Sequence, residues 1–207
     1  MINWKKNMEN KQDFEKYSQL FIEENQKVNL ISKNDEKFLW EKHIFDSLSL
    51  GNFFDKYGTP QTLLDIGTGG GFPSVPLAIK YPNIKITAID SIRKKIRAVK
   101  NLKNGLNLEN LTPVWDRVEN INEKFDVVTS RAVASLDKIC TYALPKTKNG
   151  GYFVAYKSKK APDEIENAQK ILKKFNAQII DIIEYQLPLE ETIKRNLIVI
   201  KKRNYAI

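Results

Sequence analysis

The sequence predicts an α/β fold in which seven strands form a mostly parallel sheet, preceded by an N-terminal helical segment. After residue 60, short β-rich runs alternate with stretches of helical periodicity, which is the pattern of βαβ units. The last two runs follow each other without a long helix between them, which indicates an antiparallel strand at the end of the sheet. The expected strands are residues 63–66, 84–89, 111–115, 125–130, 152–156, 178–185 and 197–200.

The segment before the sheet has the spacing of amphipathic helices. Phe14, Tyr17 and Phe21 recur at intervals of three and four, and so do Phe45 and Leu48. Gly58, Thr59 and Pro60 then break the pattern. We expect residues 1–60 to form a helical cap on a catalytic domain of residues 61–207, which folds as one compact unit.

Two helices are expected to cross between strands. Residues 91–104 place Ile92, Ile96, Val99 and Leu102 on one stripe. Residues 163–175 begin with Asp163 and Glu164, where a helix N-terminus favours negative charge.

The charge of the chain favours a polyanionic partner. The 207 residues carry a formal net charge of +9, which suits nucleic acid or an acidic membrane surface. A charge that serves only solubility is the alternative.

Several other classes are excluded. Residues 1–10 hold no apolar run of the kind a signal peptide has, and no stretch of about 18 apolar residues could span a bilayer. One cysteine, Cys140, and one histidine, His43, allow neither an internal disulfide nor a Cys/His zinc site. We expect a cytoplasmic protein without a metal and without a membrane partner.

The first expected strand ends in a glycine-rich turn, Gly67–Gly71. Such a turn lets the backbone approach a ligand at the carboxyl edge of the sheet. Asp65 precedes it and gives the D-x-G-x-G-x-G pattern of methyltransferases that use S-adenosylmethionine (SAM), whereas dinucleotide enzymes have G-x-G-x-x-G. Asp90 closes the next strand, where a carboxylate accepts from ribose hydroxyls. A purely structural turn and a nicotinamide enzyme remain alternatives.

The residues after the fourth expected strand, Ser130, Arg131 and Ala132, should face the methyl acceptor. The tetrapeptide of enzymes that methylate exocyclic amines is absent, and Cys140 lies past the strand end, which suits a small buried side chain better than a nucleophile. A ring nitrogen such as guanine N7 needs no general base and no covalent intermediate. The absence of such groups permits that chemistry without selecting it.

Six segments of the chain form a further pattern: HIFDSL at 43–48, LLDIGTGGGFPSVPLAI at 63–79, IDSIRKKIRAV at 89–99, DRVE at 116–119, FDVVTSRAVASL at 125–136 and RNLIVIKK at 195–202. In these segments the chain resembles a known family, the RsmG (GidB) methyltransferases, which make 7-methylguanosine in bacterial small-subunit ribosomal RNA. The resemblance implies a class I SAM-dependent, Rossmann-like fold, SAM as cofactor with S-adenosylhomocysteine as product, and 16S rRNA as partner, naked or within the small ribosomal subunit. We expect the enzyme to be a monomer.

The resemblance also assigns site residues. The cofactor contacts it implies, together with the turn and the ribose carboxylate, are Asp65, Gly67, Gly69, Gly71, Phe72, Asp90, Val118, Glu119 and Arg131. Phe72 either contacts cofactor or base, or packs in the core. Arg131, the one residue assigned to catalysis, is suited to the methionyl carboxylate, the guanine face or an RNA phosphate. His43 either faces the site or is held by Asp46 for packing.

Basic residues near the expected ligand edge are candidates for RNA binding: Arg93, Lys94, Lys95, Arg97, Lys157 and Lys159. The alternative is a solvated basic face. Trp115 is the aromatic residue that could stack on a base, although a core position is the expectation. Rival functions are a SAM methyltransferase with a small-molecule or protein acceptor, and a non-catalytic SAM- or RNA-binding module.

Overall fold

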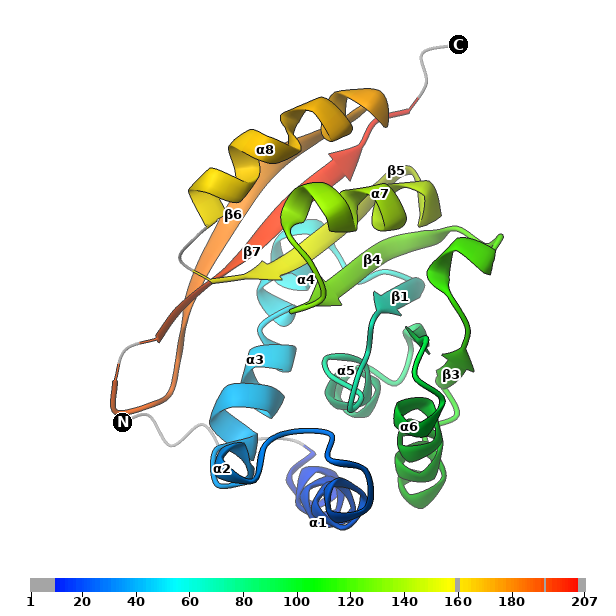
Figure 1. Ribbon diagram of the computed structural model, residues 1–207, viewed down its shortest axis with the longest axis vertical. Coiled ribbons are helices and arrows are strands. Elements are labelled where there is room, and N and C mark those ends of the chain that lie inside the picture. The colour runs from blue at the N-terminus through cyan, green and yellow to red at the C-terminus, as the bar shows by residue number, and fades with distance from the viewer. Residues whose placement is uncertain (1–9, 159–160, 192, 205–207) are drawn as a thin grey trace.

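The computed structural model describes residues 10–158, 161–191 and 193–204, and Figure 1 shows one twisted sheet at its centre. The strand order is β3-β2-β1-β4-β5-β7-β6, and β7 runs antiparallel to both of its neighbours. The predicted α/β class and the antiparallel last strand are confirmed. The strands are β1 Thr62–Ile66, β2 Lys85–Asp90, β3 Leu111–Trp115, β4 Phe125–Arg131, β5 Thr147–Lys157, β6 Ala177–Leu187 and β7 Ile193–Lys202.

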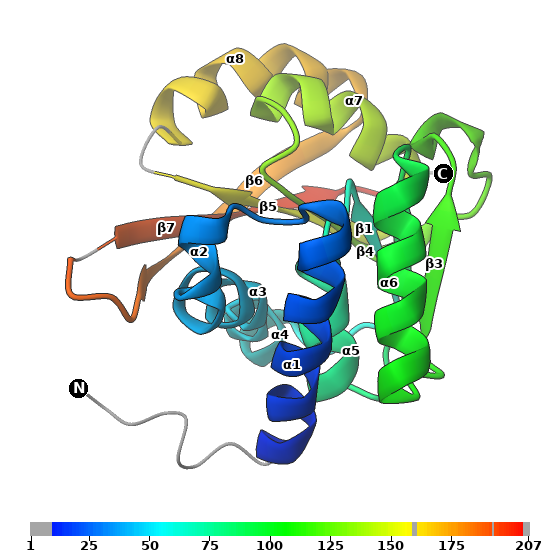
Figure 2. The same ribbon diagram turned by 60° about the horizontal axis from the view of Figure 1, so that its bottom comes forward.

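Helices cover both faces of the sheet, as Figure 2 shows. Helices α7 and α8 lie on one face, and the N-terminal helices lie on the other together with α5 and α6. The helical elements are α1 Lys11–Val28, α2 Lys33–Glu36, the π-helix η2 Leu39–Ile44, α3 Phe45–Leu48, α4 Gly51–Tyr57, α5 Ser74–Lys80, α6 Arg93–Leu106, the 3₁₀ turn η3 Val118–Asn120, α7 Leu136–Lys146 and α8 Ala161–Lys174.

Each face of the sheet has its own buried core. Phe14, Tyr17 and Phe21 of α1 are fully buried in the core that also holds Phe72. The spacing of α1 therefore fixes which of its faces meets the sheet domain. On the other face, α7 and α8 cover a core that includes Cys140. Cys140 is buried as expected, and burial raises the pKa of its thiol to about 12.

Two side chains are placed differently from expectation. Ile92, which the periodicity put on the buried stripe of the crossover helix, is 42% exposed because α6 begins only at Arg93. Trp115, expected in the core, is 53% exposed at the end of β3. Since β3 is the edge strand, no further strand of the described residues pairs beyond it to cover this ring.

The strand order reverses at β1, which lies between β2 and β4. The chain leaves β1 toward α5 on one face, and it leaves β4 toward α7 on the other face. Connections that diverge in this way open a crevice at the carboxyl ends of the two strands, where α/β sheets bind ligands.

Candidate active site

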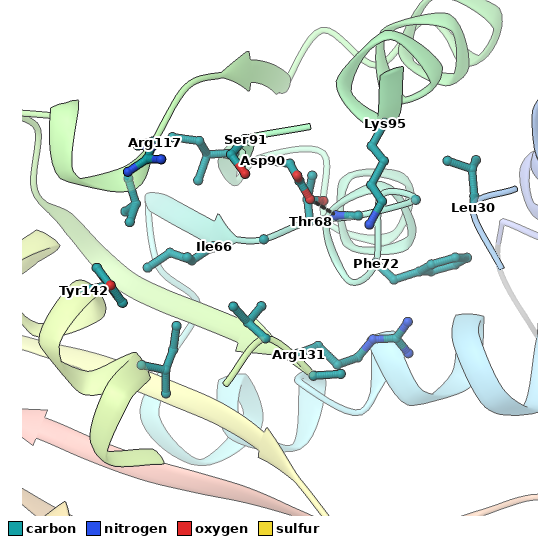
Figure 3. A pocket seen from close by; sticks show the side chains of 18 of the residues that line it. Leu30, Ile66, Thr68, Phe72, Asp90, Ser91, Lys95, Arg117, Arg131 and Tyr142 are labelled. Atoms are coloured by element: carbon teal, nitrogen blue, oxygen red, sulfur yellow. Dashed lines mark hydrogen bonds between the residues drawn. The ribbon is translucent and has the colours of Figure 1, made fainter. Parts of the chain in front are cut away.

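A cavity of about 580 Å³ occupies this crevice, and Figure 3 shows the side chains that surround it. Its walls come from the turn after β1, the end of β2, the start of α6, the loop after β3 and the turn after β4. Of the residues predicted to hold a cofactor, Gly67, Gly69, Phe72, Asp90, Val118, Glu119 and Arg131 line it. The fold thus brings these seven residues together, and their contact with a cofactor stays a prediction.

The floor of the cavity is the glycine turn. The amides of Gly67 and Thr68 both donate to the carbonyl of Ile89, at 2.9 and 3.0 Å, which ties the turn to β2. Gly69 has a φ of +58°, a conformation that glycine adopts without strain. At Gly67 a Cβ would lie 2.5 Å from the Val133 side chain. At Gly67, Gly69 and Gly70 the turn therefore presents backbone without a side chain to the cavity.

Asp90 stands at the end of β2 with its carboxylate fixed by two backbone amides. Gly69 N–H donates to Oδ2 at 3.0 Å, and Ile92 N–H donates to Oδ1 at 2.8 Å. Each carboxylate oxygen can accept a further hydrogen bond. Asp90 is 9% exposed and lines the cavity, so the carboxylate offers a pair of oriented acceptors to a ligand.

Asp65 and Gly71, which were also predicted to contact the cofactor, are not among the residues that line the cavity. The Asp65 carboxylate is fully buried, and neither of its oxygens has a hydrogen-bond partner in the described part of the chain. Burial raises its pKa to about 7, although the nearby hydroxyls of Thr68 and Ser74 oppose that rise. Gly71, with a φ of +93°, approaches Val75 too closely for a Cβ. Both residues are therefore buried parts of the turn region and not of the cavity wall.

The far wall is apolar and includes residues that the sequence did not single out. Ile89, Val118, Ile139 and Tyr142 line it, the last two from helix α7. Val118 belongs to the turn η3 after β3. This turn overlaps the segment DRVE, residues 116–119, in which a contact with the cofactor is expected. A slot with an apolar wall next to an oriented carboxylate suits a flat heterocycle attached to a sugar. The sequence gives no signal for Ile139 and Tyr142, because α7 has no motif of its own.

Arg131 ends β4 and is held by residues of the N-terminal helices. Its Nη1 contacts Asp46 Oδ2 at 2.9 Å and the carbonyl of Lys42 at 3.3 Å, and its Nη2 lies 3.2 Å from Nδ1 of His43. The guanidinium carbon is 5.1 Å from the centre of the Phe72 ring. Arg131 is therefore neutralised by Asp46, and the N–H groups that these contacts leave free are available at the cavity.

His43 contacts the site and is not held by Asp46 through a hydrogen bond. Its ring lies 5.0 Å from that of Phe72, and it lines the cavity. Burial, reinforced by the charge of Arg131, lowers its pKa to about 4. Because arginine only donates, Nδ1 of the neutral ring accepts and Nε2 carries the proton. Nε2 has no partner within the described residues.

The sequence left two positions open for Phe72, at the cofactor site or in the core, and the ring lies where the two meet. It is 4% exposed and packs against Phe21 with the ring centres 5.0 Å apart, so it belongs to the core. It also lines the cavity. The ring therefore seals the cavity against α1.

The predicted basic residues fall into three environments. Arg93, Lys94 and Arg97 are exposed on α6, whereas Lys95 points into the cavity (Figure 3). Lys157 lies in a third environment, because its ammonium contacts Glu164 and the carbonyl of Ala134, each at 2.6 Å, and its side chain is only 11% exposed. It closes an internal ion pair. Lys159 lies outside the described residues.

A second cavity of about 760 Å³ lies beyond the turn after β4. It shares His43, Arg131, Ala132 and Val133 with the first cavity. Ala132 has a φ of +56°, so the chain turns sharply between the two spaces. The described residues contain no group of three or more side chains suited to a metal ion. In the same part of the chain, no helix is long and apolar enough to cross a membrane.

Comparison with known proteins decides the family. A model of the family described as rRNA small subunit methyltransferase G (GidB) matches residues 10–197. The chain belongs to this family. Among curated relatives, the ribosomal RNA small subunit methyltransferases G of Bacillus licheniformis and Staphylococcus saprophyticus are 39% and 38% identical to it. Each alignment covers 93% of this chain and 82% of the relative.

Solved structures agree on the fold of this GidB-family chain. The N-methyltransferase NodS of Bradyrhizobium japonicum, in complex with S-adenosyl-L-homocysteine, has a TM-score of 0.62 at 14% identity, covering 87% of this chain and 99% of NodS. A putative RNA methyltransferase of Pyrococcus horikoshii has a TM-score of 0.59 at 15% identity, covering 79% of this chain and 84% of that one. The fold is that of the class I SAM-dependent methyltransferases.

Proposed function

We propose that this chain transfers the methyl group of SAM to N7 of a guanine in 16S rRNA of the small ribosomal subunit. The observation that carries the proposal is the pair of cavities that meet at Arg131, one with the features of a SAM site and one open beside it. The relatives are named for methylation of small-subunit ribosomal RNA. N7 as the target atom is the part that the family resemblance alone supports.

The first cavity fits SAM. Asp90 would accept from the ribose hydroxyls, the wall of Ile89, Val118 and Tyr142 would hold the adenine, and the bare glycine turn with Arg131 would take the methionyl end. When bound, SAM supplies a methyl group on a sulfonium centre. Lys95, which the sequence assigned to RNA, would then lie beside the cofactor.

The chemistry needs no base from the protein, because guanine N7 has a lone pair and carries no proton. The groups at the junction of the cavities agree with this. Nδ1 of His43 is occupied by Arg131 and Nε2 carries the proton, so His43 offers no free lone pair. The residues at this junction would instead orient the acceptor and exclude water. The contacts of Arg131 with Asp46 and of Phe72 with Phe21 restrict the motion of both side chains, which favours such an orienting role.

The exposed cations of α6 would bind the RNA strand outside the cavities. Arg93, Lys94 and Arg97 lie in the first turns of α6, the part of the helix from which Lys95 lines the cavity. Such contacts to phosphates give affinity without sequence preference. We propose residues 1–60 as a cap on the methyltransferase domain of residues 61–207, because Asp46 and His43 reach Arg131 from that segment.

The test is transfer of labelled methyl from SAM to small-subunit RNA, followed by digestion and nucleoside analysis. Naked 16S rRNA and small ribosomal subunits from a strain that lacks the enzyme are offered in parallel. Label in 7-methylguanosine alone is the expected result, and label in another nucleoside overturns the proposal. Binding of SAM without transfer to either substrate would favour a non-catalytic module, and transfer to a protein or small molecule would favour a different acceptor.

A further inference from the structure

Besides the four residues that it shares with the first cavity, the second cavity is lined by side chains that the first one lacks. They include Lys42 and Asp46 of the N-terminal helical segment, Ala134 and Ser135 after the turn that follows β4, and Arg195 at the start of β7. Tyr156 and Tyr185 add two aromatic rings. All lie at the edge of the sheet where β4 and β5 end and the antiparallel strand β7 begins. This cavity therefore opens beside the first one and not behind it.

The charges in its wall are paired, with one exception. Asp35 and Lys42 are 2.8 Å apart, Asp46 and Arg131 2.9 Å, and Lys157 and Glu164 2.6 Å. Arg195 has no ion pair among the residues that the structure describes. Its Nε is buried, and no acceptor lies within hydrogen-bond distance in the same part of the chain.

Arg195 has a defined place in this wall. It pairs across the sheet with Tyr185, whose hydroxyl donates to Asp46 at 2.7 Å. Side chains alternate along a strand, so Arg195 shares a face with Leu197 and lies opposite to its neighbour Lys194. Leu197 packs in the core under the N-terminal helices. Arg195 is therefore on the side of the sheet that carries His43 and Asp46.

An unpaired, partly buried arginine is poised to bind an anion. A buried donor without an acceptor costs stability, and native proteins keep such groups where a ligand or water completes them. The planar guanidinium matches phosphate oxygens in a bidentate arrangement. Because the other charges of the cavity are neutralised in pairs, an anion that enters meets a net positive wall.

We propose that the second cavity holds the acceptor nucleotide and that Arg195 binds the phosphate attached to it. This inference rests on the proposed function, because it takes a nucleotide of the acceptor RNA as the occupant. The base would then reach the shared wall of His43, Arg131, Ala132 and Val133, beyond which the methyl donor lies. The volume of about 760 Å³ is within the range of cavities that take ligands of this size.

The experiment compares Arg195→Met with Lys194→Met. The two variants remove one positive charge from adjacent residues of β7, but Lys194 is exposed and lies on the opposite face. Binding of a transcribed fragment of small-subunit rRNA is measured over a range of salt concentrations, and calorimetry with SAM checks that each variant is folded. We expect Arg195→Met to weaken RNA binding roughly ten- to hundredfold and to lower the salt slope by about one. Lys194→Met should change the affinity by less than about threefold, and both variants should bind SAM normally.

A second readout addresses the phosphate itself. Guanosine 5′-monophosphate and guanosine are compared as competitors of the RNA fragment. The nucleotide should compete better than the nucleoside against the unchanged protein, and this preference should disappear in Arg195→Met. Arg195→Lys keeps the charge but loses the bidentate geometry, so it should retain the salt slope and recover only part of the affinity.

Equal losses in Arg195→Met and Lys194→Met, or no loss in either, overturn the inference, because Arg195 would then be an ordinary surface charge. Equal competition by nucleotide and nucleoside overturns it as well. These outcomes are separate from the proposed function: RNA that binds through Arg195 without being methylated would refute only the activity. A protein that methylates guanine N7 but is insensitive to Arg195→Met would refute only the phosphate contact.

Discussion

Arg131 at the end of β4 and Asp46 in helix α3 form an ion pair of 2.9 Å that joins parts of the chain 85 positions apart. Only 16% and 6% of the two side chains are exposed. Tyr185 on β6 donates to the other oxygen of Asp46, and His43 lies against the other end of the guanidinium. The pair thus fastens the N-terminal helices to the sheet at the point where the two cavities meet.

Removal of one member of this ion pair should lower the free energy of unfolding of the protein. Asp46→Ala leaves the buried Arg131 without its counter-charge, and breaking a buried pair in this way costs about 3–5 kcal/mol. Urea denaturation followed by circular dichroism measures the change. Glu15→Ala is the control, because it removes the Lys11–Glu15 pair, whose side chains are each 56% exposed, and should cost less than about 0.5 kcal/mol. Similar losses in both variants would contradict the role given to Asp46.

Asp90→Ala should abolish measurable binding of SAM. The variant removes the carboxylate that two backbone amides orient toward the cavity, and hydrogen bonds to a charged acceptor contribute about 1.5–3 kcal/mol each. Calorimetric titration with SAM gives the affinity, and thermal denaturation shows whether the fold is kept. Glu109→Ala, at an exposed carboxylate before β3, is the control and should bind normally. Normal binding by Asp90→Ala would mean that the ribose site lies elsewhere.

Asp65 should make the chain less stable as pH rises. Its pKa is about 7 in the folded state and near 3.8 in the unfolded chain. Between these values the folded protein holds a proton that the unfolded chain has released, so the free energy of unfolding falls by about 1.4 kcal/mol per pH unit from this group. The stabilising effect is complete below pH 4 and is lost as pH rises through 7. Asp65→Asn, which stays neutral, lacks this contribution, so its free energy of unfolding relative to the unchanged protein should be higher at pH 8 than at pH 5 in urea denaturation.

The lowered pKa of His43 should make the free energy of unfolding rise with pH, which is the opposite of the Asp65 effect, over part of the same pH range. Its pKa is about 4 in the folded state against 6.5 in the unfolded chain. Between these values His43 is protonated in the unfolded chain but neutral in the folded protein. Its contribution to the free energy of unfolding therefore rises with pH up to about 6.5. We expect the two slopes to offset each other in the unchanged protein. His43→Gln should therefore expose the decline that is due to Asp65, and a flat profile in that variant would contradict the assignment.

Trp115 should contribute to RNA binding although it touches no cofactor. Its ring is 53% exposed, its Nε1 donates to the Ser91 carbonyl at 3.1 Å, and the Arg93 guanidinium lies 5.0 Å from the ring centre. A ring fixed in this way can stack on an unpaired base, a contact that contributes about 1–3 kcal/mol. Trp115→Ala should weaken binding of the rRNA fragment accordingly, as measured by filter binding. Ile182→Ala, at an exposed apolar residue of β6, is the matched control. Equal affinity of both variants would exclude stacking at Trp115.

Much of the fold could be predicted from local patterns. All seven strands lie where the β-rich runs place them, although β5 begins at Thr147 and not at residue 152. The early part of β5 contains Lys148, Asn149 and two glycines, which carry no strand signal, and in the register with β4 only Thr147 has a partner before Tyr152, with an irregularity between them. Helix α7 is not predicted by its own segment, which holds a proline and mixes polar with apolar residues. Boundaries that neighbours impose cannot be derived from the segment itself.

The sequence by itself determined the glycine turn, the carboxylate after the second strand and the family, because these depend on residue types at fixed local spacing. The tertiary structure decided which charges are free. Lys157 was expected at an RNA surface and is paired with Glu164, whereas Arg195 carried no assigned role and is unpaired beside the acceptor cavity. Whether a charge is neutralised depends on a partner that can be far away in the sequence, and only folding brings the two together.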